Sequence, residues 1–300
     1  MLTLGFFLQV LTKQKTTVNK TAVSGMVVDS RNAVPGSVFV ALTGEKVDGH
    51  QYVAEAFTNG AIMALVAREQ PNFPTIDLRR NQPLPEIRSL TPPICLLVDD
   101  TTAAMQAVAQ AWREQFDVKV IGITGSVGKT STKELTYSVL SQRFHTLKSP
   151  GNRNSILGLP PVLLQLRPAH EAAVFEMGMY TTGEISRLCE MTQPTIGVVT
   201  MIGPVHLERA GSMEAIVAAK QELVEALPAN GFAVLNKDNA YTMSMAAHTP
   251  AHVFTYGLNP SADLWADNIE SMGLEGIRFT LHQGRELMHV QVPLIGRHSV

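Results

Sequence analysis

Two glycines, a lysine and a threonine form the segment of this chain best suited to binding phosphate. Gly125 and Gly128 permit the backbone turns in which successive N–H groups converge on an anion, and a helix beginning after them adds the positive end of its dipole. Lys129 supplies a mobile positive charge for the β- and γ-phosphates, and the Thr130 hydroxyl can hold Mg²⁺. Residues 120–131 therefore predict a nucleotide site.

The loop departs from the common pattern G-x-x-x-x-G-K-[ST] at one position. The first glycine of that pattern belongs at position 123, which is Ile123, and the nearest glycines are Gly122 and Gly125. Such a segment can also be an ordinary turn with an exposed lysine. The context favours nucleotide binding, because an apolar run predicts a strand before the loop and residues 133–142 predict a helix after it.

Three further polar residues follow predicted strands in the same part of the chain. Glu176 ends the run 172–175, His206 follows the run 196–200, and Lys220 lies in the next predicted helix. Glutamate and histidine suit a divalent cation beside nucleotide phosphates. Each residue also has an ordinary alternative, as a solvated strand end, a loop histidine and part of an exposed helix face.

The first third of the chain predicts a small α/β domain, because short apolar runs alternate with helical segments. Polar loops at 29–31 and 43–50 follow strands, where open α/β sheets collect ligands, although turn formation explains them equally well. The proline-rich residues 70–93 predict a surface excursion without regular structure. Predicted strands are 25–29, 37–42, 61–66 and 94–98, and predicted helices are 1–11, 51–59 and 101–116.

The rest of the chain, from a boundary near residue 116, predicts a second and larger domain. Alternating strands and helices imply a parallel sheet with helices on both faces. Residues 277–292 alternate in polarity around Gln283 and Gly284, which predicts a β-hairpin. Predicted strands are 120–124, 172–178, 196–200, 232–236 and 252–257, and predicted helices are 133–142, a segment after residue 160, and 213–227.

Composition excludes several classes of protein. With 300 residues and 45% apolar content the chain can form about two domains with real cores. A net charge of −2, with dispersed charges, argues against a nucleic-acid partner. Cys95 and Cys189 lie far apart in apolar surroundings, which favours buried thiols in a reducing compartment. No membrane span or signal peptide is expected, so we expect a cytoplasmic monomer.

Several motifs, taken in order, resemble those of the Mur ligases, the ATP-dependent amide-forming enzymes of peptidoglycan precursor synthesis. The unusual glycine spacing around Gly125 is the spacing of that family. The motifs are Thr124-Gly-Ser-Val-Gly-Lys-Thr-Ser131, Gly151-Asn-x-Asn-x-x-x-Gly158, Glu176-Met-Gly-x-x-x-x-Gly-Glu-Ile185, Gly203-Pro-Val-His-Leu-Glu208, Ala219-Lys220 and Gly296-Arg-His298. The resemblance covers nearly the whole chain and implies the fold of that family.

Within the family, the chain most resembles the member that adds D-alanyl-D-alanine to UDP-N-acetylmuramoyl-tripeptide. The resemblance rests on Asp29-Ser-Arg31 with Pro35-Gly36, on Asp48-Gly-His50 and on the segment 176–185. It implies a UDP-sugar-binding domain at 1–116 and a central ATP-binding domain at 117–300 with a P-loop-type, mostly parallel sheet. The reaction implied passes through an acyl phosphate, with UDP-N-acetylmuramoyl-tripeptide and D-alanyl-D-alanine as the substrates.

The resemblance also implies roles for individual residues, with ATP and Mg²⁺ as cofactors. Lys129, Glu176, His206 and Lys220 are the expected catalytic residues, and Lys220 is expected to be carbamylated. Expected metal ligands are Thr130, Glu176, His206 and Lys220. Expected nucleotide contacts are Thr124, Gly125, Ser126, Val127, Gly128, Lys129, Thr130, Ser131, Asn152, Asn154 and Asn259, and expected UDP-sugar contacts are Ser30, Arg31 and His50.

Three departures from the family pattern accompany the resemblance. Met179-Tyr180-Thr181 stands where Ala-Asn-His is frequent, and Met201 stands where Asn is common. Residues 296–300 resemble the entrance to a third, C-terminal domain, so we expect the chain to be a fragment that binds nucleotide and UDP-sugar weakly and does not complete ligation. Two alternatives stay open: the Mur-type ligase of the preceding, tripeptide-forming step, and a non-catalytic nucleotide-binding module.

Overall fold

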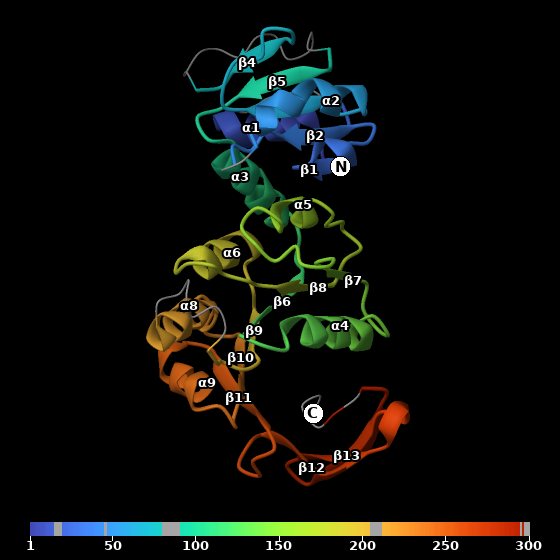
Figure 1. The fold of residues 1–300 in the computed structure, drawn as a ribbon, viewed down its shortest axis with the longest axis vertical. Helices are drawn as coiled ribbons and strands as arrows, with labels where there is room; N and C mark the ends of the chain where they lie inside the picture. Colours follow the sequence, from blue (N-terminus) through green and yellow to red (C-terminus); the bar gives the residue numbers. More distant parts are fainter. Residues whose placement is uncertain (15–19, 45–46, 80–90, 205–211, 295, 297–300) are drawn as a thin grey trace. The chain divides into compact units, whose positions relative to one another are not determined.

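The computed structural model describes residues 1–14, 20–44, 47–79, 91–204, 212–294 and 296 (Figure 1). The chain divides into two compact units. The first unit joins Met1–Asp117 to Ile156–Pro168, and the second joins Val118–Ser155 to Ala169–Val300. Each unit is built around a sheet of its own, as the predicted α/β class requires.

The described sheet of the first unit has five parallel strands in the order β1-β2-β3-β5-β4. Every residue of β2, β3 and β5 is buried, as expected for parallel strands covered on both faces. Phe39, Val66 and Leu97 are among the residues of the apolar core. The strands are β1 (Gly25–Val27), β2 (Ser37–Val40), β3 (Met63–Val66), β4 (Thr75–Asp77) and β5 (Ile94–Leu97).

Two of the helices of the first unit begin where a side chain caps their free N–H groups. Asp100 accepts hydrogen bonds from the N–H groups of Thr102 and Ala103 at 2.7 and 3.0 Å, which fixes the start of α3. Trp112 of α3 packs edge-on against Phe6 of α1. The helices are α1 (Leu4–Thr12), α2 (Val53–Thr58), α3 (Thr101–Arg113) and α5 (Pro160–Leu163), with short 3₁₀ turns η1 (Ser30–Asn32) and η2 (Gly49–Tyr52).

Strand β4 corrects the prediction of an irregular excursion over residues 70–93. Thr75–Asp77 pair with β5 at the edge of the sheet. Ile76 is buried while its two neighbours in the strand are not, so a single apolar side chain was the only signal in a proline-rich sequence. Residues 80–90 of the same segment lie outside the described residues.

Residues 156–168 group with the first unit, although the sequence placed them in the second domain. The Trp112 indole N–H donates to the Leu166 carbonyl at 3.3 Å, and the Gln106 amide donates to the Ile156 carbonyl at 3.1 Å. Helix α5, whose residues are all buried, packs against α3. This apolar segment therefore has its core partners in the first unit.

The described sheet of the second unit has nine strands in the order β14-β13-β12-β11-β10-β9-β6-β8-β7. Strands β6 to β12 pair in parallel, and β13 and β14 are antiparallel to their neighbours. The predicted, mostly parallel sheet is confirmed. The strands are β6 (Lys119–Thr124), β7 (Thr146–Lys148), β8 (Ala172–Glu176), β9 (Ile196–Val199), β10 (Phe232–Asn236), β11 (His252–Gly257), β12 (Leu264–Ser271), β13 (Ile277–Gln283) and β14 (Glu286–Val292).

Helices cover both faces of this sheet, as predicted (Figure 1). A Cβ atom at Gly122 or Gly197 would lie 2.9 or 3.1 Å from Leu223 of α8, so these glycines let α8 approach one face closely. Leu140 of α4 packs against Ile121 and Ile123 on the other face. The helices are α4 (Lys129–Leu140), α6 (Glu184–Thr192), α8 (Met213–Glu225) and α9 (Ala240–Ser244), with 3₁₀ turns η4 (Met245–His248) and η5 (Gly273–Glu275).

Helix α4 begins four residues earlier than the predicted start at Lys133. Gly128, at φ +87°, is its N-cap residue, so Lys129 and Thr130 belong to the first turn. The sequence places polar residues over this turn, without the apolar spacing from which a helix start is usually inferred. The earlier start ties Lys129 and Thr130 rigidly to the glycine loop.

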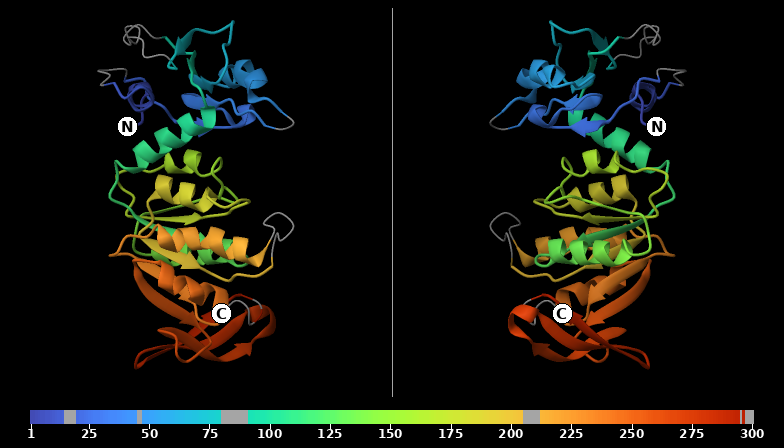
Figure 2. Two further views of the ribbon diagram at one scale, coloured as in Figure 1. Left: turned by 90° about the vertical axis from the view of Figure 1, so that its left-hand side faces the viewer. Right: turned by 90° about the vertical axis from the view of Figure 1, so that its right-hand side faces the viewer.

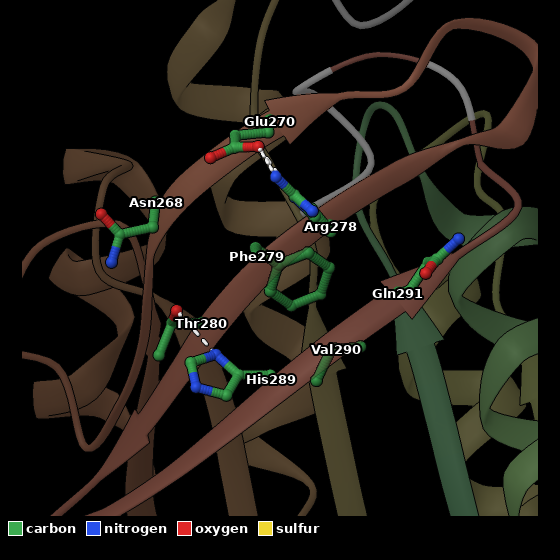
Figure 3. A pocket seen from close by; sticks show the side chains of 8 residues that line it. All are labelled: Asn268, Glu270, Arg278, Phe279, Thr280, His289, Val290 and Gln291. Carbon is green, nitrogen blue, oxygen red and sulfur yellow. Dashed lines mark hydrogen bonds and ion pairs between the residues drawn. The ribbon is translucent and has the colours of Figure 1, made fainter.

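Strands β12, β13 and β14, which run antiparallel to one another in turn, form one end of this sheet (Figure 2). The predicted hairpin over 277–292 is confirmed as β13 and β14. A pocket of about 480 Å³ lies on these strands (Figure 3). Within it Arg278 donates to Glu270 at 2.7 Å and Thr280 lies 3.3 Å from His289. Four of its polar side chains thus form two pairs, and the predicted site residues do not line it.

Both cysteines are buried and free, which confirms the prediction of buried thiols. Burial raises the pKa of Cys95 to about 11 and that of Cys189 to about 12, so both thiols stay protonated and unreactive near neutral pH. Within the described ranges, none of the helices combines the length and the apolar character of a membrane span.

Candidate active site

The strand register places the carboxyl ends of β6, β8 and β9 at one edge of the second unit's sheet. Each of these ends is followed by a loop. Ile123 of β6 pairs with Glu176 of β8, and Thr124 of β6 pairs with Val199 of β9. The residues that follow these strands therefore meet around the glycine loop between β6 and α4. In a parallel sheet this carboxyl edge is where ligands bind.

The glycine loop requires backbone conformations that other residues adopt with difficulty. Gly125 has φ +147° and Gly128 has φ +87°. A Cβ atom at position 125 would lie 2.0 Å from the Thr200 hydroxyl oxygen. No described side chain caps the N-terminus of α4, which begins directly after the loop. Such a helix start is suited to an anionic ligand.

The segment after β9 holds the loop by hydrogen bonds. The Thr200 hydroxyl lies 2.6 Å from the Val127 carbonyl and 3.2 Å from the Thr124 carbonyl. The Ser126 hydroxyl donates to the Gly203 carbonyl at 3.0 Å and accepts from the Gly203 N–H at 3.1 Å. These contacts hold the glycine loop against the end of β9.

Lys129 and Lys220 converge on the same backbone oxygen. The Lys129 ammonium donates to the Gly125 carbonyl at 3.0 Å and to the Ser126 carbonyl at 3.4 Å, and the Lys220 ammonium donates to the Gly125 carbonyl at 3.0 Å. Burial lowers the pKa of Lys129, partly offset by the charge of Glu176. Burial, and then the charge of Lys129, lowers the pKa of Lys220 to about 8. An uncharged, nucleophilic Lys220 amine is therefore accessible near neutral pH.

Glu176 is the centre of a buried polar cluster beside the loop, and its residue is 3% exposed. The Thr130 hydroxyl donates to one carboxylate oxygen at 2.8 Å, and the Asn154 amide donates to the other at 2.8 Å. The Lys133 ammonium lies 3.9 Å from the first oxygen. The Glu176 N–H donates to the Ser149 hydroxyl at 3.2 Å, so the carboxylate is held in one orientation.

The donor set around Glu176 fits magnesium. The Thr130 hydroxyl and the Glu176 carboxylate supply adjacent oxygen ligands, and Mg²⁺ completes its shell with water and phosphate oxygens. Among the described residues there is no group of three or more His, Cys, Asp or Glu that could hold a metal ion. His206, predicted to help hold a second Mg²⁺, lies outside the described residues. The Lys220 ammonium, which donates to the Gly125 carbonyl, would repel a cation.

The remaining predicted nucleotide residues lie in two loops. Asn152 precedes Asn154 in the turn after β7, and its carbonyl accepts from the Asn154 N–H at 2.8 Å. Asn259 follows β11, where its N–H donates to Asp238 at 3.1 Å and its side-chain oxygen accepts from the Ser261 N–H at 2.9 Å. Asn154 thus joins the Glu176 cluster, whereas the described contacts of Asn259 lie within its own turn and to Asp238, in the loop after β10.

His50, predicted to contact substrate, is buried in the first unit with both ring nitrogens bonded. Nδ1 lies 2.6 Å from an Asp48 carboxylate oxygen, and Nε2 accepts from the Ala67 N–H at 2.9 Å. Because Nε2 is an acceptor, the ring proton lies on Nδ1. These bonds connect the loop after β2 with the end of β3.

Ser30 and Arg31 lie in η1, directly after β1. The Ser30 hydroxyl donates to Glu55 at 2.8 Å and is buried. The Arg31 guanidinium makes two hydrogen bonds to the Asp29 carboxylate, at 2.9 and 2.7 Å, and its side chain is 80% exposed. Arg31 is therefore the more accessible of the two for an anionic ligand.

Comparison with known proteins identifies the family. The family profile described as the Mur ligase middle domain matches residues 123–300. This chain belongs to the Mur ligase family. A second profile, described as Mur ligase family, catalytic domain, matches residues 22–91. The middle-domain match contains the glycine loop, Glu176 and Lys220.

Curated relatives of this Mur ligase chain carry the name UDP-N-acetylmuramoyl-tripeptide–D-alanyl-D-alanine ligase. The Synechocystis protein is 36% identical over 279 residues, which cover 92% of this chain and 55% of the relative. The Escherichia coli protein is 35% identical over 274 residues, which cover 91% of this chain and 56% of the relative. The chain thus spans about half the length of the curated relatives it matches.

Solved Mur ligase structures share the fold. MurF from Acinetobacter baumannii superposes with a TM-score of 0.83 at 31% identity, covering 98% of this chain and 61% of that one. MurF from Thermotoga maritima, solved in complex with ADP, superposes with a TM-score of 0.72 at 26% identity, covering 90% of this chain and 58% of that one. The fold expected from the resemblance is confirmed.

Two residues of this Mur ligase site were missed by sequence reasoning. Thr200 contacts the loop through its hydroxyl, and its carbonyl accepts from the Tyr256 hydroxyl at 3.1 Å. Burial raises the pKa of Tyr256 to about 12, so this hydroxyl keeps its proton. Lys133 was read only as the start of a helix. A lysine spaced four residues after Lys129, on the same helix face, was the available signal.

Proposed function

We propose that the protein to which these residues belong is an ATP-dependent, ADP-forming ligase that joins D-alanyl-D-alanine to UDP-N-acetylmuramoyl-tripeptide in peptidoglycan precursor synthesis. The observation that carries the proposal is the contact between Thr130 and Glu176 beside a glycine loop that holds Lys129 and Lys220. The names of the relatives support the choice of substrates.

The chemistry requires two oxyanions to approach each other. The terminal carboxylate of the tripeptide attacks the γ-phosphorus of ATP, ADP leaves, and an acyl phosphate forms. The D-alanyl-D-alanine amine then attacks the acyl carbon and expels phosphate. Lys129, once released from the Gly125 and Ser126 carbonyls, neutralises charge on the transferred phosphoryl group.

We propose that Thr130 and Glu176 hold one Mg²⁺ and that His206 helps to hold a second. A bound magnesium ion supplies charge neutralisation between carboxylate and phosphate. For Lys220 we propose carbamylation. The uncharged amine attacks CO₂, an N–C bond forms, one C–O π bond breaks, and a proton leaves to water. The lowered pKa of Lys220 favours the amine that this step requires.

The other assignments follow the position of each residue. The glycine loop, residues 124–131, together with Asn152, Asn154 and Asn259, binds the nucleotide. Ser30, Arg31 and His50, in the 3₁₀ turns after β1 and β2 of the first unit, form the UDP-sugar region. The protein acts in the cytoplasm as a monomer without nucleic-acid partners, consistent with the near-neutral, dispersed charge.

Phosphate release from ATP by the complete gene product tests this function. With UDP-N-acetylmuramoyl-tripeptide present, release that depends on D-alanyl-D-alanine is expected. Release with UDP-N-acetylmuramoyl-dipeptide and a diamino acid instead would assign the protein to the preceding ligation step. Binding of ATP without release in either mixture would contradict a ligase and favour the non-catalytic module.

A further inference from the structure

Helix α4 buries a lysine. Among the described residues of α4, Lys133 is the one classed as buried, and it is 0% exposed. The helix packs against β7 and β8, so the ammonium lies between helix and sheet. Removing an ammonium group from water is costly unless partners surround it. Neither the phosphate-binding loop nor the proposed metal ligands include this residue.

The ammonium of Lys133 has three oxygen partners on three segments. It donates to the Gly151 carbonyl at 3.1 Å, lies 3.2 Å from the Glu134 carboxylate, and lies 3.9 Å from the Glu176 carboxylate. An ammonium group has three N–H donors. Lys133 therefore connects α4, the turn after β7, and the end of β8.

The turn that begins at Gly151 also contacts the Glu176 carboxylate, through its second oxygen. Gly151, at φ +53°, begins the turn that contains Asn154. The Asn154 amide donates to the second Glu176 oxygen at 2.8 Å, and the Asn154 carbonyl accepts from the Gly178 N–H at 2.8 Å. Lys133 thus contacts Glu176 and also the turn that carries the second donor to Glu176.

We propose that Lys133 is a positioning residue that holds the 151–154 turn against Glu176 and so keeps the Glu176 carboxylate aimed beside Thr130. The consequence for magnesium-nucleotide binding rests on the proposed function. An apolar residue in this place would serve helix packing at least as well, since buried ion pairs seldom stabilise a fold more than apolar contacts. Orientation of the Glu176 carboxylate explains why this position holds a lysine. Groups that orient metal ligands have large effects on metal affinity.

Amide hydrogen exchange tests the positioning without any ligand. In the complete gene product, Lys133→Met should raise exchange at the Gly178 N–H about 10-fold, because its acceptor in the turn loses a tether. The matched control is Lys148→Met. Lys148 pairs with the same Glu134 from the other side, and neither Gly151 nor Glu176 is among its described hydrogen-bond or ion-pair partners. The control should leave exchange at Gly178 unchanged.

Magnesium dependence tests the consequence. Lys133→Met should raise the Mg²⁺ concentration required for ATP-dependent phosphate release by about 10- to 100-fold, while Lys148→Met should not. In the double variant Lys133→Met, Asn154→Ala, the fold-increase in the required Mg²⁺ concentration should be smaller than the product of the two single-variant increases, because both residues act on one carboxylate. If the methionine variant does not fold, Lys133→Gln, which also removes the charge, is measured instead.

The two experiments separate the two claims. Unchanged exchange at Gly178 together with unchanged magnesium dependence in a folded Lys133 variant would overturn the positioning role. Faster exchange in that variant, from a parent protein that releases no phosphate, would support the positioning role and contradict the proposed ligase. Multiplicative losses in the double variant would show that Lys133 and Asn154 act independently, against the proposal.

Discussion

The ammonium groups of Lys129 and Lys220 both donate to the carbonyl oxygen of Gly125, each at 3.0 Å. Two like charges therefore share one acceptor in a buried site. The arrangement lowers the pKa of Lys220 to about 8, through burial first and the Lys129 charge second. We expect a bound phosphate group to draw the Lys129 ammonium away from the Gly125 carbonyl. The protonation of Lys220 would then depend on whether nucleotide is bound.

Lys220 should make stability depend on pH. Its folded pKa, about 8, lies below the ordinary lysine pKa of 10.5. The unfolded chain therefore binds more protons between these two values, and the parent gains stability as pH rises through them. The free energy of unfolding of Lys220→Met should exceed that of the parent by roughly 3 kcal/mol at about pH 7, and the difference should shrink toward about pH 10. Urea unfolding in CO₂-free buffer measures this, and a difference independent of pH would contradict it.

Lys220 should also carry a carbamate. With ¹³C-labelled bicarbonate, a carbamate signal should appear in the parent protein, increase with pH through about 8 as the amine loses its proton, and be absent from Lys220→Met. In Lys129→Met this increase should move to higher pH, because removal of the neighbouring charge raises the pKa of Lys220. A signal that persists in Lys220→Met would show that another amine is modified.

Thr200 should control nucleotide affinity through its hydroxyl. Thr200→Val keeps the shape of the side chain but removes its 2.6 Å hydrogen bond to the Val127 carbonyl, which stabilises the loop conformation by about 0.5–1.5 kcal/mol. We expect about 10-fold weaker ATP binding, with the Michaelis constant for D-alanyl-D-alanine unchanged. Thr200→Ser, which retains the hydroxyl, is the control and should bind ATP like the parent. Equal affinities in all three proteins would refute this role.

Arg31 and His50 should respond differently to substitution. Arg31→Ala should raise the Michaelis constant of the UDP-linked substrate and leave the unfolding free energy unchanged, because the side chain is 80% exposed. His50→Ala should lower the unfolding free energy by about 1–3 kcal/mol, since Asp48 and the Ala67 N–H lose buried partners. Substrate kinetics and urea titrations on both variants check this, and the reverse pattern would contradict it.

The parallel sheets were predictable because their strands are apolar runs separated by helical segments. Two of the strands that sequence reasoning missed lack such a signal. Strand β4 buries only Ile76, and β12 contains an irregularity between Asp267 and Glu270, near Asn268 at φ +48°, which disrupts the alternation of a strand. Helix α6 does have apolar residues at helical spacing, Ile185 and Leu188, but its first N–H groups donate to Glu222, which lies far away in the sequence, so no local capping residue among those described marks its start.

The meeting of Thr130 and Glu176 could be anticipated, because both follow strands of one parallel sheet and each has a side chain suited to magnesium. Thr200 and Lys133 could not be found in this way. The role of Thr200 depends on where the loop directs its carbonyls, and the role of Lys133 depends on which face of α4 meets the sheet. Both facts exist only in the folded chain.

The most direct test of the account follows one oxygen atom. The complete gene product is given ATP, D-alanyl-D-alanine and UDP-N-acetylmuramoyl-tripeptide labelled with ¹⁸O in its terminal carboxylate, and the released phosphate is analysed by mass spectrometry. Attack of the carboxylate on ATP, followed by attack of the amine, places one ¹⁸O atom in each phosphate released. The Glu176→Gln variant should be inactive and should release no labelled phosphate. Phosphate that contains no ¹⁸O would contradict the proposed ligase chemistry.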